Sequence, residues 1–166
     1  MDIVVYPEGT AEWAGRRFPC ALGRAGVTED KREGDGATPA GRFPLRRVLY
    51  RPDRTDPPAS VLPVAPLHPL DGWCDHTGDK RYNQLIRQPY SASFELLWRE
   101  DHIYDVIVLL GYNDDPVVPG RGSAIFLHAA RPDFTPTRGC IAFARENLLR
   151  LIEECESSTR LCVKPG

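Results

Sequence analysis

Glycine and proline interrupt this chain so often that long regular helices are excluded from most of it. Together they make up 30 of the 166 residues, well above the roughly 12% of an average protein. The apolar runs between them are short, and short apolar runs between frequent turns are more typical of strands than of helices. A chain of this length forms about one domain with a core of its own. We therefore expect a single, mainly β domain over residues 1–166.

Two apolar runs predict buried central strands. Tyr104–Leu110 (YDVIVLL) is rich in β-branched residues and ends at a glycine, and Ser123–Ala129 (SAIFLHA) follows after a turn region. Weaker strands are expected at Ile3–Tyr6, Arg17–Leu22, Arg42–Arg51 and Thr159–Val163, with Ser91–Arg99 left open between strand and helix. Residues 52–69, with six prolines, are expected to form an extended loop or a sheet edge, and residues 71–81 a polar loop. We expect a mostly antiparallel arrangement.

One helix is predicted near the C-terminus. Apolar residues recur at helical spacing along one face of residues 145–156, with charged residues on the other face. The apolar face consists of Leu148, Leu149, Leu151, Ile152 and Cys155. Because Cys155 falls on this face, it is expected to be a core residue, as is Cys162 in the last strand.

The net charge and the apolar runs of the chain bear on its expected binding partners and its expected compartment. The formal net charge is −2 and the pI about 6.1, which argues against a nucleic-acid-binding protein. The first apolar run stops at Pro7, too early for a secretory signal, and no run approaches the ~18 residues of a membrane span. The five cysteines are odd in number, so reduced thiols are expected. We expect a cytoplasmic protein, or a periplasmic one if a leader was removed. The oligomeric state is left open.

A histidine and a cysteine near the end of the second buried strand carry the clearest chemical signal. Eleven residues separate His128 from Cys140, which follows Gly139 and precedes the run into the helix. A cysteine nucleophile needs a neighbouring imidazole or positive backbone dipoles that favour the thiolate, and the imidazole later returns the proton to the leaving amine. The N–H groups of residues 138–140 are candidate oxyanion donors. On spacing alone the signal is weak, because a cysteine and a histidine at this separation are more often core residues.

Two segments resemble those of a known family. His128, followed after eleven residues by Thr137-Arg138-Gly139-Cys140-Ile141, is similar to the signature of the L,D-transpeptidase (YkuD-type) catalytic domain. Upstream, Thr38-Pro39-Ala40-Gly41-Arg42-Phe43 resembles the segment Thr-Pro-x-Gly-x-Phe of the same family. The resemblance spans roughly residues 3–152. It implies a mainly β, sandwich-like fold, with one C-terminal helix after the catalytic cysteine.

The resemblance also implies roles for individual residues. Cys140 would attack the carbonyl of the L-configured centre of a diamino acid in a peptidoglycan stem peptide, and terminal D-alanine would leave. His128 would act as base and then as acid, oriented by a backbone carbonyl, with Asp133 as a secondary candidate for that task. Gly139 and Cys140 would supply oxyanion N–H groups, and Thr137 takes the place of the family's serine.

Two positions depart from the family pattern. Ala129 replaces the glycine expected after the histidine, and Ala142 replaces an arginine expected two residues after the cysteine. Arg138 or Arg131 is expected to supply the missing positive charge for substrate binding. Trp73 and Tyr112 are further candidates for substrate contact, because they sit in loops and at strand ends.

The function expected from these residues is cysteine-dependent acyl transfer on peptidoglycan stem peptides or muropeptides. An L,D-carboxypeptidase of muropeptide recycling is favoured, because water is the most abundant acceptor for a thioester in the cytoplasm. A cross-linking or D-amino-acid-exchanging L,D-transpeptidase is the alternative, and a non-catalytic wall-peptide or carbohydrate binding module is a weaker one. A metal hydrolase built on Cys74, His76 and His102 is a third alternative. Since the chain lacks the paired cysteines of closed zinc sites, neither a metal nor another cofactor is expected.

Overall fold

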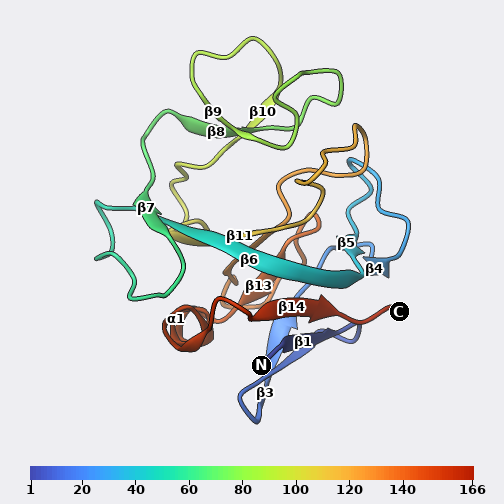
Figure 1. Ribbon diagram of the computed structural model, residues 1–166, viewed down its shortest axis with the longest axis vertical. Helices are drawn as coiled ribbons and strands as arrows, with labels where there is room; N and C mark the ends of the chain where they lie inside the picture. Colours follow the sequence, from blue (N-terminus) through green and yellow to red (C-terminus); the bar gives the residue numbers. More distant parts are fainter.

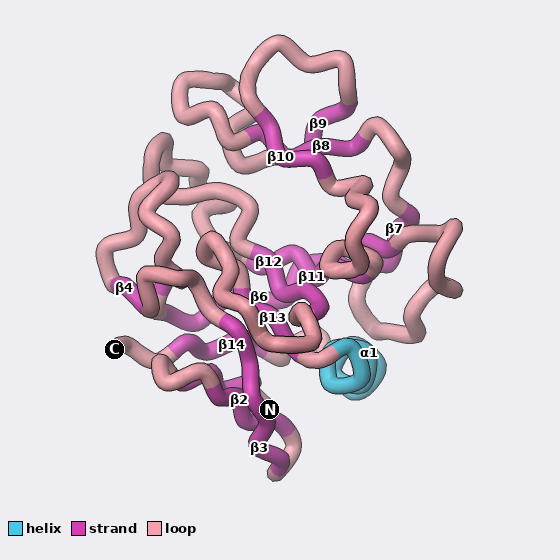
Figure 2. The backbone as a smooth tube through the Cα atoms, turned by 180° about the vertical axis from the view of Figure 1, so that it is seen from behind, coloured by secondary structure: helices cyan, strands magenta, loops and turns pink.

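Strands dominate the computed structural model, which describes all residues 1–166, and one helix accompanies them (Figures 1 and 2). In chain order, the elements are β1 (Ile3–Tyr6), β2 (Thr10–Trp13), β3 (Arg16–Ala21), β4 (Val27–Thr28), β5 (Thr38–Pro39), β6 (Gly41–Tyr50), β7 (Val64–Pro66), β8 (Asp71–Cys74), β9 (Leu85–Arg87), β10 (Phe94–Leu96), β11 (Val106–Leu110), β12 (Phe126–Ala129), β13 (Ile141–Phe143), α1 (Arg145–Glu154) and β14 (Arg160–Val163). This is the mainly β fold with one C-terminal helix that the sequence predicts.

The long strand β6 closes the main sheet on itself. The order of strands is β11-β12-β13-β3-β2-β1-β14-β6-β7, and β6 also pairs with β11. The first part of β6, Gly41–Pro44, lies against β14, whereas Leu45–Tyr50 lies against β11. β6 therefore belongs to both layers, and the sheet folds back into a sandwich-like barrel in which few edges stay unpaired. Figure 1 shows β6 crossing the middle of the molecule.

The main core fills the space between the two layers. Side chains such as Ile3, Val48, Val108, Leu127 and Ile141 are 1% exposed or less and belong to one cluster of 25 buried residues. α1 covers one end of this core with Leu148, Leu151 and Ile152, all fully buried. Burial of such side chains is the main source of stability for a domain of this size.

A three-stranded sheet, β10-β8-β9, stands apart from the main sheet. Figure 1 shows it in green above β11 and β6. A second cluster of nine buried residues lies between the two sheets; it includes Leu49, Leu109, Phe126, Tyr104 and Cys140. The second core therefore holds the cysteine that the sequence marks as the candidate nucleophile.

Most of the expected elements are confirmed, with some differences. The helix ends at Glu154, two residues before the predicted end. The strand β2 was not predicted, and residues 71–81, expected to be a loop, contain β8. The open segment 91–99 contains the short strand β10. Pairing is mostly antiparallel, but four pairs are parallel: β1–β14, β4–β5, β6–β7 and β12–β13. The single helix has ten residues, and no helix is long and apolar enough to cross a bilayer.

Candidate active site

The parallel pair β12–β13 brings the candidate histidine and cysteine together. His128 lies on β12 opposite Ala142 of β13, and Cys140 immediately precedes β13. Both side chains line a cavity of about 530 Å³. Two parallel neighbours need a crossover of about a dozen residues, which residues 130–140 supply. The spacing between the two residues is therefore what this topology requires.

Cys140 is a buried thiol in the resting structure. Its side chain is enclosed so that the residue is only 8% exposed. Sγ donates to the Ala124 carbonyl at 3.1 Å and accepts from the Phe126 N–H at 3.4 Å. Burial, and secondarily the charge of Glu95, raises the pKa of Cys140 to about 12. Desolvation therefore outweighs the nearby dipoles and favours the neutral thiol in this state.

His128 is held in one tautomer by the backbone. Its Nδ1 lies 2.9 Å from the Ala129 carbonyl oxygen. Because a carbonyl only accepts, Nδ1 carries the proton and Nε2 is free to accept one. Burial lowers the pKa of His128 to about 4, so the ring is neutral at pH 7. The other orienting candidate, Asp133, instead bonds Thr135 within its exposed loop.

Tyr104 and Glu95 connect the two candidate residues. The ring of Tyr104 packs edge-on against His128, with centroids 5.2 Å apart. Its hydroxyl donates to Glu95 Oε1 at 2.6 Å. Burial raises the pKa of Glu95. Tyr104 and Glu95 therefore set the electrostatic environment of the nucleophile.

The loop before Cys140 has a fixed and strained shape. Gly139 has a φ of +144°, and a Cβ there would lie 2.9 Å from the Ala37 carbonyl oxygen, so only glycine fits. Its N–H donates to Thr137 Oγ1 at 3.1 Å, and that hydroxyl donates to the Cys140 carbonyl at 2.7 Å. The Gly139 N–H is thus occupied within the loop and does not serve as an oxyanion donor in this state. The N–H groups of Arg138 and Cys140 have no acceptor in the protein.

The upstream family-like segment braces this loop. Thr38 is fully buried, and its Oγ1 accepts from the Gly23 N–H at 2.9 Å. Residues 22–24 in turn bond Thr137, through Thr137 N–H to Leu22 carbonyl at 2.8 Å and Arg24 N–H to Thr137 carbonyl at 2.9 Å. The two motifs, a hundred residues apart in sequence, are therefore joined by one short chain of hydrogen bonds.

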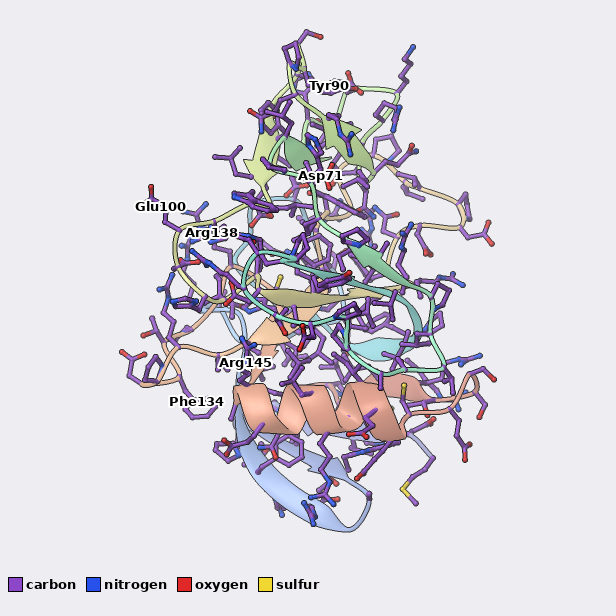
Figure 3. The ribbon with its side chains drawn as sticks, turned by 90° about the vertical axis from the view of Figure 1, so that its left-hand side faces the viewer. Asp71, Tyr90, Glu100, Phe134, Arg138 and Arg145 are labelled. Carbon is purple, nitrogen blue, oxygen red and sulfur yellow. The ribbon has the colours of Figure 1, made fainter.

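Charged side chains surround the cavity, and three of its four lysines and arginines are in ion pairs. Lys31, almost fully buried, pairs with Asp35. The side chains of Arg99 and Arg131 share Asp101, at 2.7 Å and 3.2 Å. Arg138 also lines the cavity, but it is exposed and takes part in no ion pair. Figure 3 shows Arg138 between the three-stranded sheet, marked by Asp71 and Tyr90, and α1, marked by Arg145.

Arg131 and Arg138, the two arginines expected to replace the family's arginine, differ in whether they form an ion pair. Ala142 lines the cavity opposite His128 and leaves no charge there. Of the two candidates, Arg131 is engaged by Asp101, whereas Arg138 is free to meet a substrate carboxylate.

The remaining predicted residues lie elsewhere. Trp73 and Tyr112 line a different cavity of about 350 Å³, and neither lines the one that holds Cys140. Cys74, His76 and His102 do not come together into a group of three side chains placed for a metal ion. His102 instead lies 2.8 Å from Asp105.

Several lining residues were missed by sequence reasoning. Glu95 fell in a segment of undecided structure, and Tyr104 was recognised only as the start of a buried strand. Lys31 and Glu33 belong to the loop before β5, where only the glycines drew attention. Glu33 accepts from Tyr82 at 2.7 Å and from a serine at 2.5 Å. A local signal for these residues is absent, because their placement depends on tertiary contacts.

Comparison with known proteins places the chain in a family. Among solved structures, it is similar to an L,D-transpeptidase from Mycobacterium smegmatis (13% identity, TM-score 0.46, 98% of this chain and 58% of that one) and to the helical cell shape determining protein Pgp2 from Campylobacter jejuni (14% identity, TM-score 0.47, 99% and 48%). The chain thus spans about half the length of these structures. A search of curated protein sequences finds no match. The model of the YkuD family, described as the L,D-transpeptidase catalytic domain, matches residues 3–163, and the chain therefore belongs to this family.

Proposed function

We propose that this protein is a cysteine acyltransferase that cleaves peptidoglycan stem peptides before a terminal D-alanine. One observation carries the proposal. His128 on β12 and Cys140, immediately before the parallel neighbour β13, line one cavity. Family membership supports the same chemistry, since the matching model is that of a transpeptidase catalytic domain.

The proposed reaction starts from the neutral thiol of Cys140 and the neutral imidazole of His128. The thiol proton, directed at the Ala124 carbonyl at rest, turns to Nε2 of His128 as Sγ attacks the carbonyl of the L-configured centre. The tetrahedral oxyanion is met by the N–H groups of Cys140 and Arg138, which are not used inside the protein. His128 then gives the proton to the amine of D-alanine, which leaves, and a thioester remains. A second nucleophile, activated by His128, resolves the thioester.

Water is the proposed second nucleophile, which makes the enzyme an L,D-carboxypeptidase. An amine competes with water only if the site holds it at high effective concentration. The proposed compartment is the cytoplasm, with soluble muropeptides as substrates. Five free cysteines, four of them buried, are typical of a protein kept in a reducing compartment.

One feature favours transfer as a second candidate function. Three carboxylates, Glu33, Asp75 and Glu95, line the cavity. They would attract the ammonium form of an acceptor amine. With an amine as acceptor, the product is a cross-linked dimer or a stem with an exchanged terminal residue.

Incubation with disaccharide-tetrapeptide, followed by product mass analysis, tests the proposal. Tripeptide plus free D-alanine supports the carboxypeptidase, whereas dimers or exchanged D-amino acids support the transpeptidase. Cys140→Ala is expected to abolish either product, and a thioester adduct on Cys140 should be detectable in the wild type. Cys162→Ala, on β14 away from the cavity, is the matched control. Binding of substrate without any product, unchanged in Cys140→Ala, would instead indicate a binding module.

A further inference from the structure

A second cavity lies between the main sheet and the three-stranded sheet, beside the catalytic one. Its volume is about 350 Å³, at the small end of the roughly 300–1,000 Å³ usual for ligand sites. β6 and β11 contribute Leu49 and Leu109, and the three-stranded sheet contributes Trp73 and Leu85. Phe126 completes the apolar wall. In Figure 1, β8 and β9, which carry Trp73 and Leu85, lie above β6 and β11.

The aromatic wall of this cavity is rigid. Trp73 Nε1 donates to Asn83 Oδ1 at 2.9 Å, which fixes the indole. The Trp73 ring meets Phe126 edge-on, with centroids 5.0 Å apart. Asn83 is itself held, because its Nδ2 donates to the carbonyls of Tyr112 and Asn113 at 3.1 Å and 2.7 Å. A wall already fixed in this way loses little freedom when a ligand packs on it.

The charges around the cavity do not balance. Arg46, Arg47 and Asp114 are the charged lining residues. Arg46 forms a two-point pair with Asp114, at 2.8 Å and 3.1 Å. Arg47 has no ion pair, and its buried Nε has no hydrogen-bond partner in the protein. One positive charge is therefore left over in a mostly apolar cavity.

The position of Arg47 in the sheet is unusual for a cation. It lies opposite Leu109 in the β6–β11 pair, two residues before Leu49, and both leucines are buried on the face covered by the three-stranded sheet. Leaving a buried donor such as this Nε unpaired carries a free-energy cost. An apolar side chain would avoid that cost, and the partly buried guanidinium of Arg47 is available to a partner from outside the chain.

We propose that this cavity binds a small organic anion, an aromatic or branched-chain carboxylate. Its carboxylate pairs with Arg47, and its apolar part packs against Trp73 and Phe126. The proposal does not depend on the acyltransferase function, because Cys140 does not line this cavity. Phe126 nevertheless places the occupant next to the backbone that holds the nucleophile.

Binding of 3-phenylpropionate to the full ¹⁵N-labelled chain tests the proposal, with the Trp73 indole N–H resonance as the reporter. Trp73→Phe assigns that resonance among the three tryptophans. The neutral isostere 3-phenylpropanamide is the matched ligand. We expect a saturable shift of the Trp73 signal, with the acid bound about tenfold or more tightly than the amide. Cys140→Ala is expected to bind the acid as the wild type does.

The matched variants are Arg47→Met and Arg46→Met. Arg47→Met should remove the preference for the acid, whereas Arg46→Met should keep it. The proposal is overturned if acid and amide bind equally to the wild type, if Arg47→Met retains the preference, or if neither ligand moves the Trp73 signal at about 10 mM. The comparison of acid with amide on the wild type decides the question even if Arg47→Met does not fold.

Discussion

The two cavities share a wall but differ in character. The catalytic cavity, about 530 Å³, is lined mostly by polar and charged side chains, whereas the second, about 350 Å³, is mostly apolar with one unpaired arginine. Ile125 lines both. The ring of Phe126 meets Trp73 of the second cavity and Tyr104 of the first, with centroids 5.0 Å and 6.0 Å apart. The two residues Ile125 and Phe126, at the start of β12, therefore form the boundary between the polar catalytic cavity and the apolar second cavity.

This shared wall explains the resting state of the nucleophile. Cys140 belongs to the same buried cluster as Phe126 and Leu109, so its thiol is packed like a core residue although it lines a cavity. Such burial raises the pKa of Cys140 and lowers that of His128. The chemistry proposed for the first cavity therefore starts from a neutral thiol and a neutral imidazole and includes proton transfer to His128 during attack.

The largest expected effect is that of Gly139→Ala, a change in the loop that lines the catalytic cavity only. Gly139→Ala places a Cβ 2.9 Å from the Ala37 carbonyl oxygen at a φ of +144°. The loop must shift, so we expect kcat/KM to fall about 100-fold and the free energy of unfolding to fall by about 1–3 kcal/mol. Steady-state kinetics and urea unfolding measure the two effects. Gly78→Ala, whose nearest neighbour is 3.6 Å away, is the control, and normal activity of Gly139→Ala would contradict the role given to this loop.

The next effect concerns pH and the buried imidazole. The folded-state pKa of His128 is about 4, below the ~6.5 of an unfolded chain. Between these values the unfolded chain binds a proton that the folded chain does not, so stability is present above pH 6.5 and is lost as the pH falls toward 4. We expect the free energy of unfolding of the wild type to drop by about 3 kcal/mol more than that of His128→Gln between pH 7 and pH 4.

Urea unfolding of both proteins at the two pH values gives this difference, and contributions from other carboxylates cancel in it. A difference below about 1 kcal/mol would mean that His128 is accessible to protons in the folded state. The catalytic cavity would then be open to solvent at His128. The neutral resting state ascribed to its thiol and imidazole would no longer hold.

The sequence predicts the residues of the catalytic cavity better than those of the second cavity. His128 and Cys140 were found because their flanking residues form a recognisable motif, and the parallel pairing of β12 with β13 explains their spacing only once the structure is known. Thr38 was found only as part of a second motif. Its link to Thr137 passes through residues 22–24 and leaves no trace in the local sequence.

Residues placed by tertiary packing could not be predicted. Trp73 and Tyr112 look like cleft aromatics in sequence, but strands β8 and β11 direct them to the second cavity. Arg47 reads as an ordinary strand residue, and only its register opposite Leu109 shows that it faces an apolar space. The three-stranded sheet consists of strands of three or four residues, too short for a pattern of alternation to stand out.

A smaller effect is expected from the acid beside the nucleophile. The charge of Glu95 contributes to the raised pKa of Cys140. Glu95→Gln removes the charge but keeps an acceptor for Tyr104, so the pKa of the thiol should fall and alkylation of Cys140 by iodoacetamide at pH 8 should accelerate about fivefold. Mass analysis of the peptide that contains Cys140 measures the rate. Glu33→Gln, in the same cavity but bonded to Tyr82, should leave the rate unchanged, and an equal acceleration there would point to a general loosening of the cavity.

The smallest effect on catalysis is expected from Trp73, which lines the second cavity. Trp73 and Tyr104 both contact Phe126, but only Tyr104 lines the catalytic cavity and bonds Glu95. We expect Trp73→Phe to change kcat/KM by less than about twofold, and Tyr104→Phe to lower it about tenfold, because the second change removes a hydrogen bond beside the reacting sulfur. Steady-state kinetics on both variants measures the difference. If Trp73→Phe lowers kcat/KM as far as Tyr104→Phe does, Phe126 transmits packing changes to Cys140, and the two cavities form a single functional site.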